Sequence, residues 1–343
     1  MRNRTLPVIE TPGRDGLAGR LFDLIQAPLR WQLLACALDL GLFDRLDPPA
    51  TAADLADPLG LDATRLGRVL DGLAAMGLLD KTHGRYGLTA EAAPLLRADG
   101  AGSMRDLLLT LPRLRHGDVA GLLKDPGPVP APDMASPGFW DGSANSLRAF
   151  HRAMGADTAL DLLARLPEWP SARRLLDLGA GSEVLACRLA DRHPQLDITV
   201  FDLPPMADRI RARLNGRPVT VIAGDMNDTG FGAGYDIVWT SMTLYYARDL
   251  AGVLARIRRA LAPGGVFVTL HEALTAERTA PETHVTGRLV PALRGQDRSF
   301  DDGAIAAAMA RAGFTRIDSR LVETAFGPFR MDCGRGRCRP PHL

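Results

Sequence analysis

The sequence predicts an α/β protein, in which a Rossmann-like, doubly wound sheet follows a mostly helical domain with the plan of a winged helix. From about residue 166 onward, short apolar runs alternate with helical stretches, which is typical of a parallel sheet with crossover helices. The first hundred residues instead read as helix, turn, helix and strand pair. A chain of 343 residues is also too long for one ordinary core, so two domains are expected.

The amino-terminal domain is expected over residues 1–100. Residues 17–41 repeat apolar side chains at three- and four-residue spacing, which predicts one long helix. Thr51 and Asp62 each precede a further helical stretch, as residues that cap helices do. Residues 84–96 then read as a small strand hairpin followed by another helix. This order is the plan of a winged helix.

A winged helix raises the possibility of DNA binding, and the charge of the segment argues against it. Residues 51–90 contain four basic and five acidic side chains. A protein that binds DNA needs cations to neutralise phosphates, and this segment has no surplus of them. Its many leucines and alanines favour a packing or dimerisation surface.

The second half carries the parallel sheet. The helix expected over residues 248–261 has the clearest apolar face, and the APGG sequence after it turns the chain into the next strand. Ligands of such sheets bind at the carboxyl ends of the strands, so we expect the functional site there. The expected strands lie within residues 173–178, 197–202, 219–226, 235–242 and 266–274.

The bulk composition excludes several classes of protein. The formal net charge is +1, so no strong field selects nucleic acid or an anionic membrane as a partner. No stretch is apolar and long enough to span a bilayer, and the first residues lack a signal-peptide core. Cys333 and Cys338 have no further ligands at metal-binding spacing, so no metal site is expected. We therefore expect a cytoplasmic protein.

A glycine-rich turn follows the first strand of the sheet. Gly179 and Gly181 form a Gly-x-Gly motif, in which the backbone can turn sharply and approach a ligand. Asp202 ends the next strand, where an acid can hold ribose hydroxyls. A dinucleotide-binding fold would carry a third glycine where Val184 stands. The motif alone admits both a dinucleotide and another nucleoside cofactor.

Further motifs accompany this turn. Asp177 precedes it, FDLP follows at the ribose-acid position, AGDM ends the third strand, and AFHRAM and LAPGG lie before and late in the domain. The set resembles the class I S-adenosylmethionine-dependent methyltransferases, specifically the small-molecule O-methyltransferase family with an amino-terminal winged-helix dimerisation domain. The resemblance covers most of the chain. It implies S-adenosyl-L-methionine as cofactor and a homodimer formed through residues 1–100. It also implies a helical connector to the substrate pocket over 101–165 and a catalytic domain over 166–343.

The resemblance assigns cofactor-binding roles to residues at the ends of the first four strands. The two glycines would line the methionine and ribose, and the acid of FDLP would bind the ribose hydroxyls. The acid and hydrophobe of AGDM would hold and cover the adenine. Ser241 stands where many members carry a lysine. The implied cofactor site comprises Gly179, Gly181, Asp202, Leu203, Asp225, Met226 and Ser241.

The pair Tyr245 and Tyr246 departs from the family pattern. In the O-methyltransferases a histidine that acts as general base normally stands where Tyr245 stands here. Imidazole suits proton removal near neutral pH, whereas a phenol with an ordinary pKa near 10 is a poor base. The substitution resembles the branch of the family that methylates carbon. There, Tyr245 would hold the ring hydroxyl of the acceptor.

Two histidines could replace the missing base. His271 ends the strand within 266–274, and His284 lies in the segment that closes the substrate pocket in the family. Asp301 or Asp302 stands near the place of a family glutamate that orients the catalytic histidine. The resemblance also implies a pocket wall for a flat ring. The expected pocket residues are Phe150, His151, Met154, Tyr246 and Asp301.

These observations predict a methyltransferase that acts on a small phenolic metabolite in bacterial antibiotic biosynthesis. Methylation of a ring carbon is favoured, with 3-hydroxykynurenine as candidate acceptor, and methylation of the phenolic oxygen is the alternative. Two other classes stay open: a NAD-dependent oxidoreductase, and a winged-helix regulator that senses S-adenosylmethionine.

Overall fold

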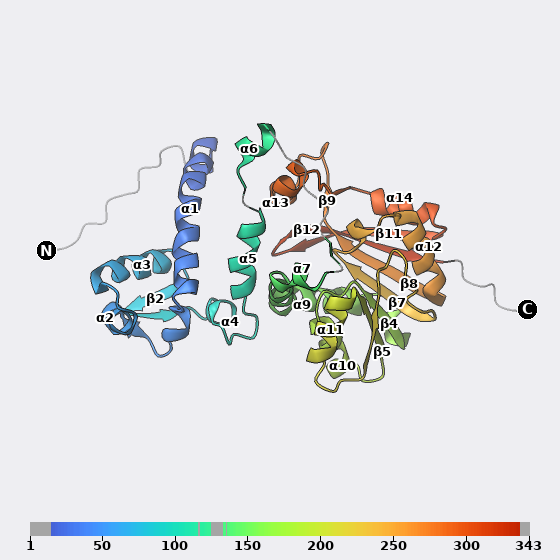
Figure 1. Cartoon of the computed structure of the whole chain (residues 1–343), viewed down its shortest axis with the longest axis horizontal. Helices are drawn as coiled ribbons and strands as arrows, with labels where there is room; N and C mark the ends of the chain where they lie inside the picture. The colour runs from blue at the N-terminus through green and yellow to red at the C-terminus, as the bar shows by residue number, and fades with distance from the viewer. Residues whose placement is uncertain (1–14, 116, 125–132, 135, 337–343) are drawn as a thin grey trace, which may run out of the picture. The chain divides into compact units, whose positions relative to one another are not determined.

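The computed structural model describes residues 15–115, 117–124, 133–134 and 136–336. The chain divides into two compact units, with the boundary between Arg105 and Asp106 (Figure 1). The predicted α/β class with a helical amino-terminal domain is confirmed. The finer division, with a connector over 101–165, stays a prediction. No helix among the described residues is long and apolar enough to cross a membrane.

The amino-terminal unit has the predicted winged-helix plan. The side chain of Thr51 accepts a hydrogen bond from the N–H of Asp54, and the side chain of Asp62 accepts one from the N–H of Arg65, so both predicted caps are present. The three strands form one antiparallel sheet in the order β1-β3-β2. Its elements are α1 (Leu17–Asp39), β1 (Ala50–Thr51), α2 (Ala52–Ala56), α3 (Ala63–Ala75), β2 (Leu79–Thr82), β3 (Arg85–Leu88) and α4 (Ala93–Leu96).

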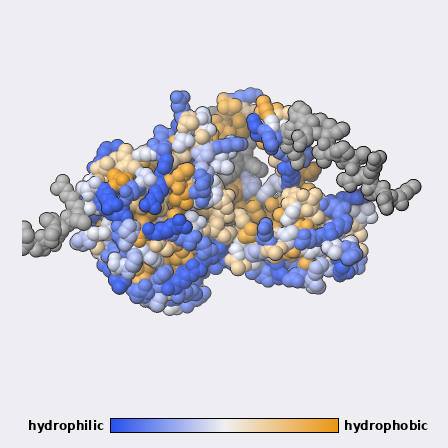
Figure 2. Space-filling model, turned by 180° about the vertical axis from the view of Figure 1, so that it is seen from behind, coloured by the Kyte–Doolittle hydropathy of each residue, from blue (hydrophilic) through white to orange (hydrophobic). Residues whose placement is uncertain are grey.

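Helix α1 has an exposed apolar face. Only Ala37 and Leu38, near its end, are buried. Its large apolar side chains in the first half are more than half exposed, including Phe22 and Ile25. Apolar patches also interrupt the mainly polar surface on the face shown in Figure 2. A contiguous exposed apolar face of this kind is typical of an interaction surface. The side chains concerned are Leu17, Leu21, Phe22, Leu24, Ile25 and Leu29.

The second unit contains a seven-stranded sheet in the order β11-β12-β8-β7-β4-β5-β6. Strands β4 to β8 run parallel to one another, and β12 pairs antiparallel with both β8 and β11 to add an antiparallel edge. The expected doubly wound sheet is therefore present. The strands are β4 (Arg174–Leu178), β5 (Asp197–Asp202), β6 (Val219–Ala223), β7 (Tyr235–Ser241), β8 (Leu261–His271), β11 (Arg316–Thr324) and β12 (Gly327–Arg335).

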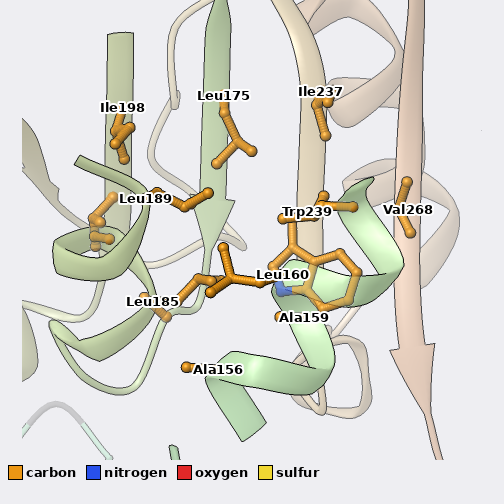
Figure 3. Close-up of a cluster of buried hydrophobic side chains, with 14 of the residues drawn as sticks. Ala156, Ala159, Leu160, Leu175, Leu185, Leu189, Ile198, Ile237, Trp239 and Val268 are labelled. Carbon is orange, nitrogen blue, oxygen red and sulfur yellow. The ribbon is translucent and has the colours of Figure 1, made fainter. Parts of the chain in front are cut away.

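Helices cover both faces of this sheet because successive side chains of each strand point to opposite faces. Trp239 packs with Leu160 on the face covered by α9, α10 and α11 (Figure 3). Val238 and Phe267 pack on the other face, against α12 and α14. The helices are α9 (Ala156–Ala164), α10 (Val184–Arg192), α11 (Pro204–Arg213), α12 (Leu250–Ala260), α13 (Glu282–Leu293) and α14 (Ala304–Arg311).

Several short elements complete the chain and bring residues to the carboxyl edge of the sheet. A π-helical turn at His151–Gly155 follows α8, and a 3-10 turn at Leu244–Tyr246 follows β7. Both turns contain residues that the sequence assigned to the site. The other elements are α5 (Arg105–Arg115), α6 (Val119–Lys124), α7 (Pro137–Asp141), α8 (Ala144–Phe150), β9 (Ala273–Leu274) and β10 (Phe300–Asp301).

Candidate active site at the carboxyl edge of the sheet

The glycine turn after β4 packs closely against the segment after β7. Gly179 and Gly181 both adopt positive φ, at 75° and 65°, where a side chain is strained. A Cβ on Gly179 would also lie 2.3 Å from Cγ2 of Thr243. The Thr243 hydroxyl donates to the carbonyl groups of Gly179, at 3.2 Å, and Ser241, at 2.9 Å. Glycine is therefore required at position 179 by both conformation and space.

The carboxylate of Asp202 ties this turn to the end of β5. Its two oxygens accept the N–H groups of Gly181, at 2.7 Å, and Leu203, at 2.8 Å. Burial raises the pKa of Asp202 to about 6, although the two hydrogen bonds favour the charged form. Burial, reinforced by the charge of Asp202, raises the pKa of Asp177 to about 8, so Asp177 carries a proton at neutral pH.

Each Asp202 oxygen has lone-pair capacity beyond its backbone hydrogen bond. The carboxylate can therefore accept hydroxyl donors while it holds the turn, and the glycine beside it leaves backbone exposed to a ligand. This arrangement fits the ribose of a nucleoside cofactor.

The AGDM motif lies at the end of β6. Asp225 Oδ1 accepts the backbone N–H and the side-chain amide of Asn227, and Oδ2 lies 3.4 Å from Nη2 of Arg248. Met226 is buried in the core beside α12, and its carbonyl accepts a hydrogen bond from Arg256. The structure thus places Asp225 in a network at the sheet edge and Met226 in the apolar core.

The rings of Tyr245 and Tyr246 pack against each other after β7 at an interplanar angle of 57°, and an arginine lies over each ring. Their ring centroids are 4.5 Å apart. The Arg288 guanidinium lies 4.9 Å from the Tyr245 ring centroid, and that of Arg298 lies 4.7 Å from the Tyr246 ring centroid. Burial raises the pKa of Tyr245 far above its ordinary value, with a smaller contribution from Tyr246. Tyr245 therefore stays protonated and cannot act as a base near neutral pH.

A chain of contacts links Tyr245 to His284: Arg288 lies over the Tyr245 ring, and Glu272 contacts both Arg288 and His284. The Arg288 Nε donates to Glu272 Oε2 at 2.7 Å, and the other oxygen lies 3.6 Å from Nδ1 of His284. Nε2 of His284 lies 2.7 Å from the carbonyl oxygen of Pro328, which can only accept, so Nε2 carries the proton. The sequence predicted no role for Glu272 and missed Arg288.

His271 belongs to a different buried group. Its Nε2 lies 3.7 Å from Oδ2 of Asp332, and neither ring nitrogen forms a hydrogen bond with a described residue. Burial and, to a smaller extent, the positive charge of Arg330 together lower the pKa of His271 to about 4. Burial raises the pKa of Asp332. His271 is therefore neutral at physiological pH and separate from the His284 group.

The AFHRAM motif lines the glycine turn from the other side. Nδ1 of His151 lies 2.7 Å from Oγ of Ser182, and burial lowers the pKa of His151 to about 4. The Phe150 ring packs edge-on against Phe326 at 5.6 Å. Met154 is half-buried in the same π-helical turn. Two of the expected wall residues thus have defined aromatic or polar partners at this edge.

Two other predictions concern Asp301 and the cysteines. The Asp301 side chain is 64% exposed and pairs with Arg278, so it lies on the surface beside the site. Cys333 is buried, whereas Cys338 lies outside the described residues. Within those residues, no group of three or more potential ligands could hold a metal ion.

The fold and this edge define a class I methyltransferase. Residues 176–269 match the family model described as a methyltransferase domain, and residues 22–98 match the O-methyltransferase dimerisation domain. The human N-acetylserotonin methyltransferase, solved in complex with S-adenosylmethionine, superimposes with a TM-score of 0.75 at 20% identity, over 95% of this chain and 100% of that one.

Several curated relatives come from Streptomyces. The 2,7-dihydroxy-5-methyl-1-naphthoate 7-O-methyltransferase of S. carzinostaticus is 31% identical over 75% of this chain and 81% of its own. The 3-hydroxy-5-methyl-1-naphthoate 3-O-methyltransferase of S. sahachiroi is 29% identical, over 79% and 82%. The N,N-dimethyltransferase OxyT of S. rimosus is 29% identical, over 90% and 94%.

The chain belongs to the S-adenosylmethionine-dependent methyltransferases that carry an O-methyltransferase dimerisation domain. It is an enzyme, and S-adenosyl-L-methionine is its cofactor, as the sequence predicted. The NAD-dependent oxidoreductase is thereby excluded as an interpretation of the Gly-x-Gly turn.

Replacing Gly179 with alanine should destabilise the protein through both a steric clash and backbone strain. The same replacement at Gly216 is a control that tests backbone strain alone. Gly216 has φ of 78°, but no atom lies within 4 Å of the position that a Cβ would take, so Gly216→Ala carries only the strain. We expect Gly216→Ala to lower the free energy of unfolding by about 1 kcal/mol and Gly179→Ala by about 3 kcal/mol, because the contact with Thr243 adds overpacking. Urea denaturation would measure both, and equal losses would contradict the close approach.

The raised pKa of Asp202 predicts a pH dependence of cofactor affinity. The carboxylate is the form that accepts hydroxyl donors, and it becomes protonated as the pH falls through about 6. The dissociation constant of S-adenosylhomocysteine, measured by calorimetry, should therefore rise roughly tenfold between pH 7 and pH 5. Asp202→Asn should bind weakly at both pH values. If the dissociation constants of wild type and Asp202→Asn changed with pH in the same way, a group other than Asp202 would be responsible for the pH dependence.

Proposed function

We propose that this enzyme transfers the methyl group of S-adenosylmethionine to a hydroxyl oxygen of a small aromatic acceptor. The observation that carries the proposal is the pair of naphthoate O-methyltransferases, which align with three quarters or more of the chain. The proposed setting is a cytoplasmic step of bacterial antibiotic biosynthesis.

The proposed cofactor site follows the carboxyl ends of β4 to β7. Gly181 and Asp202 would hold the ribose, with Leu203 beside the adenine. Asp225 would contact the adenine, and the buried Met226 would support the loop from within the core. Gly179 and Ser241, both bonded to Thr243 through their carbonyl groups, would border the methionine portion. When bound, the cofactor supplies a sulfonium-activated methyl group.

The proposed acceptor site is built around Tyr245. Displacement at a sulfonium is accelerated mainly by holding the acceptor oxygen close and aligned. The protonated phenol of Tyr245 would donate a hydrogen bond to that oxygen, and Arg288, held by Glu272, fixes the ring from above. The wall of the pocket would comprise Phe150, His151, Met154 and Tyr246, with Asp301 at its outer border.

His284 is the preferred candidate for the base that removes the proton of the acceptor hydroxyl. Its Nδ1 adjoins Glu272, which is hydrogen-bonded to the arginine above Tyr245. His271 lies in the separate group with Asp332, which makes it the second candidate. The comparison of His284→Asn with His271→Asn would distinguish the two.

Methylation of a ring carbon is the second candidate function. It is favoured by one observation, the presence of Tyr245 where O-methyltransferases normally place a histidine. A phenolate carries negative charge on its ortho and para carbons, so a ring held by Tyr245 could present carbon to the sulfonium. The acceptor 3-hydroxykynurenine belongs to this candidate.

We also infer a homodimer. Residues 22–98 match a dimerisation domain, and the apolar face of α1 lies largely within that range. Six large apolar side chains in one helix would bury a substantial area against a second copy, and apolar burial is the main driving force of such association.

The site of methylation can be read directly from the product. The enzyme would be incubated with methyl-carbon-13-labelled S-adenosylmethionine and hydroxylated naphthoates, benzoates and 3-hydroxykynurenine, followed by carbon NMR. We expect the label in the methoxy region. A label in the aryl-methyl region would show C-methylation and contradict the proposal. An N-methyl signal would show N-methylation, the activity for which OxyT is named.

Tyr245→Phe should lower kcat/KM about 10- to 100-fold, because one hydrogen bond to a partly charged oxygen is lost in the transition state. The affinity for S-adenosylhomocysteine should be unchanged. Tyr86→Phe, which removes a phenol from the amino-terminal unit, is the control and should leave kcat/KM near wild type. An unchanged rate in Tyr245→Phe would mean that the phenol does not touch the acceptor.

A further inference from the structure

Arg298 is a half-buried cation on the substrate side of the site. Its guanidinium lies 4.7 Å from the ring centroid of Tyr246, and Nη1 lies 3.8 Å from Sδ of Met134. Tyr246 is packed against the core on the α12 side of the sheet, whereas Met134 is packed against the core on the α9 side. Arg298 therefore spans the carboxyl edge of the sheet, between its two layers.

Arg298 differs from the neighbouring arginines in having no carboxylate partner among the residues that the structure describes. Three arginines in the same region have carboxylate partners: Arg278 pairs with Asp297 and Asp301, Arg288 with Glu272, and Arg330 with Asp302. Arg298 forms no ion pair with any carboxylate in the described part of the chain. An arginine that is partly removed from water beside an aromatic ring, with no anionic partner among the described residues, is suited to receive an anion from a ligand.

The contact with the Tyr246 ring also restricts the position of the guanidinium. A planar guanidinium held over a ring directs its N–H groups outward in its own plane, which matches the two oxygens of a carboxylate. The Tyr246 ring in turn contacts Tyr245, the proposed partner of the acceptor oxygen. A flat acceptor held at Tyr245 could thus extend an acidic substituent toward Arg298.

We propose that Arg298 binds the carboxylate of the acceptor, so that the substrates of this enzyme are hydroxylated aromatic acids. The inference rests on the proposed methyl transfer to a small aromatic acceptor, whose substrate class it specifies. The named acceptors of two relatives are naphthoates, which agrees with this class.

The methionine portion of the cofactor also carries a carboxylate, so Arg298 could in principle bind the cofactor instead of the acceptor. The acceptor is the better match because Arg298 contacts Tyr246, whose ring packs against Tyr245, the proposed partner of the acceptor oxygen. Gly179 and Ser241, which are proposed to border the methionine portion, instead share hydrogen bonds with Thr243. The experiment must distinguish the two carboxylates.

The test compares a hydroxynaphthoate with the matching neutral hydroxynaphthamide. Wild type should bind the acid, as its complex with S-adenosylhomocysteine, about 10- to 100-fold more tightly than the amide, because charge-assisted hydrogen bonds exceed neutral ones. Arg298→Gln should lose this preference and retain the affinity for the amide. Arg298→Lys should retain part of it, because the charge persists without the planar fork. Calorimetry measures these affinities, and KM values follow the same order.

Arg294→Gln is the matched control, because Arg294 is an exposed arginine four positions away and its loss changes the net charge equally. It should leave the preference intact. An unaltered acid preference in Arg298→Gln, or failure of the wild-type complex to bind any hydroxynaphthoate, would overturn the proposal. So would weaker S-adenosylhomocysteine binding with unchanged acid preference, because Arg298 would then bind the cofactor.

Failure of this proposal can be told apart from failure of the proposed function. Equal methylation of acid and amide by wild type and Arg298→Gln would leave methyl transfer established and remove the role of Arg298. Arg298-dependent binding of the acid, with no methyl transfer to it, would keep the carboxylate site and remove the acceptor chemistry.

Discussion

The two backbone N–H groups that share the carboxylate of Asp202 are the interaction on which the site depends. They tie the turn after β4 to the end of β5, and this fixes where a nucleoside can approach the backbone. Burial opposes the negative charge, whereas the hydrogen bonds favour it, and the balance leaves a pKa of about 6. The neighbouring acid Asp177 is also buried, and the negative charge of Asp202 helps to keep it protonated at neutral pH. One negative charge is therefore concentrated at the edge of the sheet where the proposed ribose site needs a hydrogen-bond acceptor.

The opposite side of the site is organised by cations over aromatic rings. Arg288 and Arg298 lie over Tyr245 and Tyr246, but only Arg288 has a carboxylate partner among the described residues. The Glu272–Arg288 pair neutralises itself and fixes the Tyr245 ring, whereas Arg298 keeps a net positive charge. The sheet edge thus carries a negative group, Asp202, at the proposed ribose site and a positive group, Arg298, beside Tyr246. A ligand with a positive or hydroxyl-rich end and a negative end would complement this distribution of charge.

Features that depend on neighbours in sequence could be predicted. The caps at Thr51 and Asp62, the Gly-x-Gly turn and the acid at Asp202 follow from local backbone needs, and all are present. Features that depend on packing could not. The contact of Thr243 with Gly179 joins residues 64 positions apart, and Arg288 and Arg298 meet the tyrosines across more than 40 positions. No periodicity encodes such pairs. The sequence likewise could not tell that His271 and His284 belong to separate buried groups.

The replacement of a histidine by Tyr245 shifts a requirement onto the acceptor. A buried phenol whose pKa is raised holds its proton, so it can stabilise an oxygen that is losing one but cannot remove it. An acceptor hydroxyl that ionises readily needs less help from a base. The ring of an aromatic acid bound at Arg298 would lie beside that guanidinium group, whose positive charge favours the phenolate. Recognition of the carboxylate and activation of the hydroxyl would then have the same electrostatic origin.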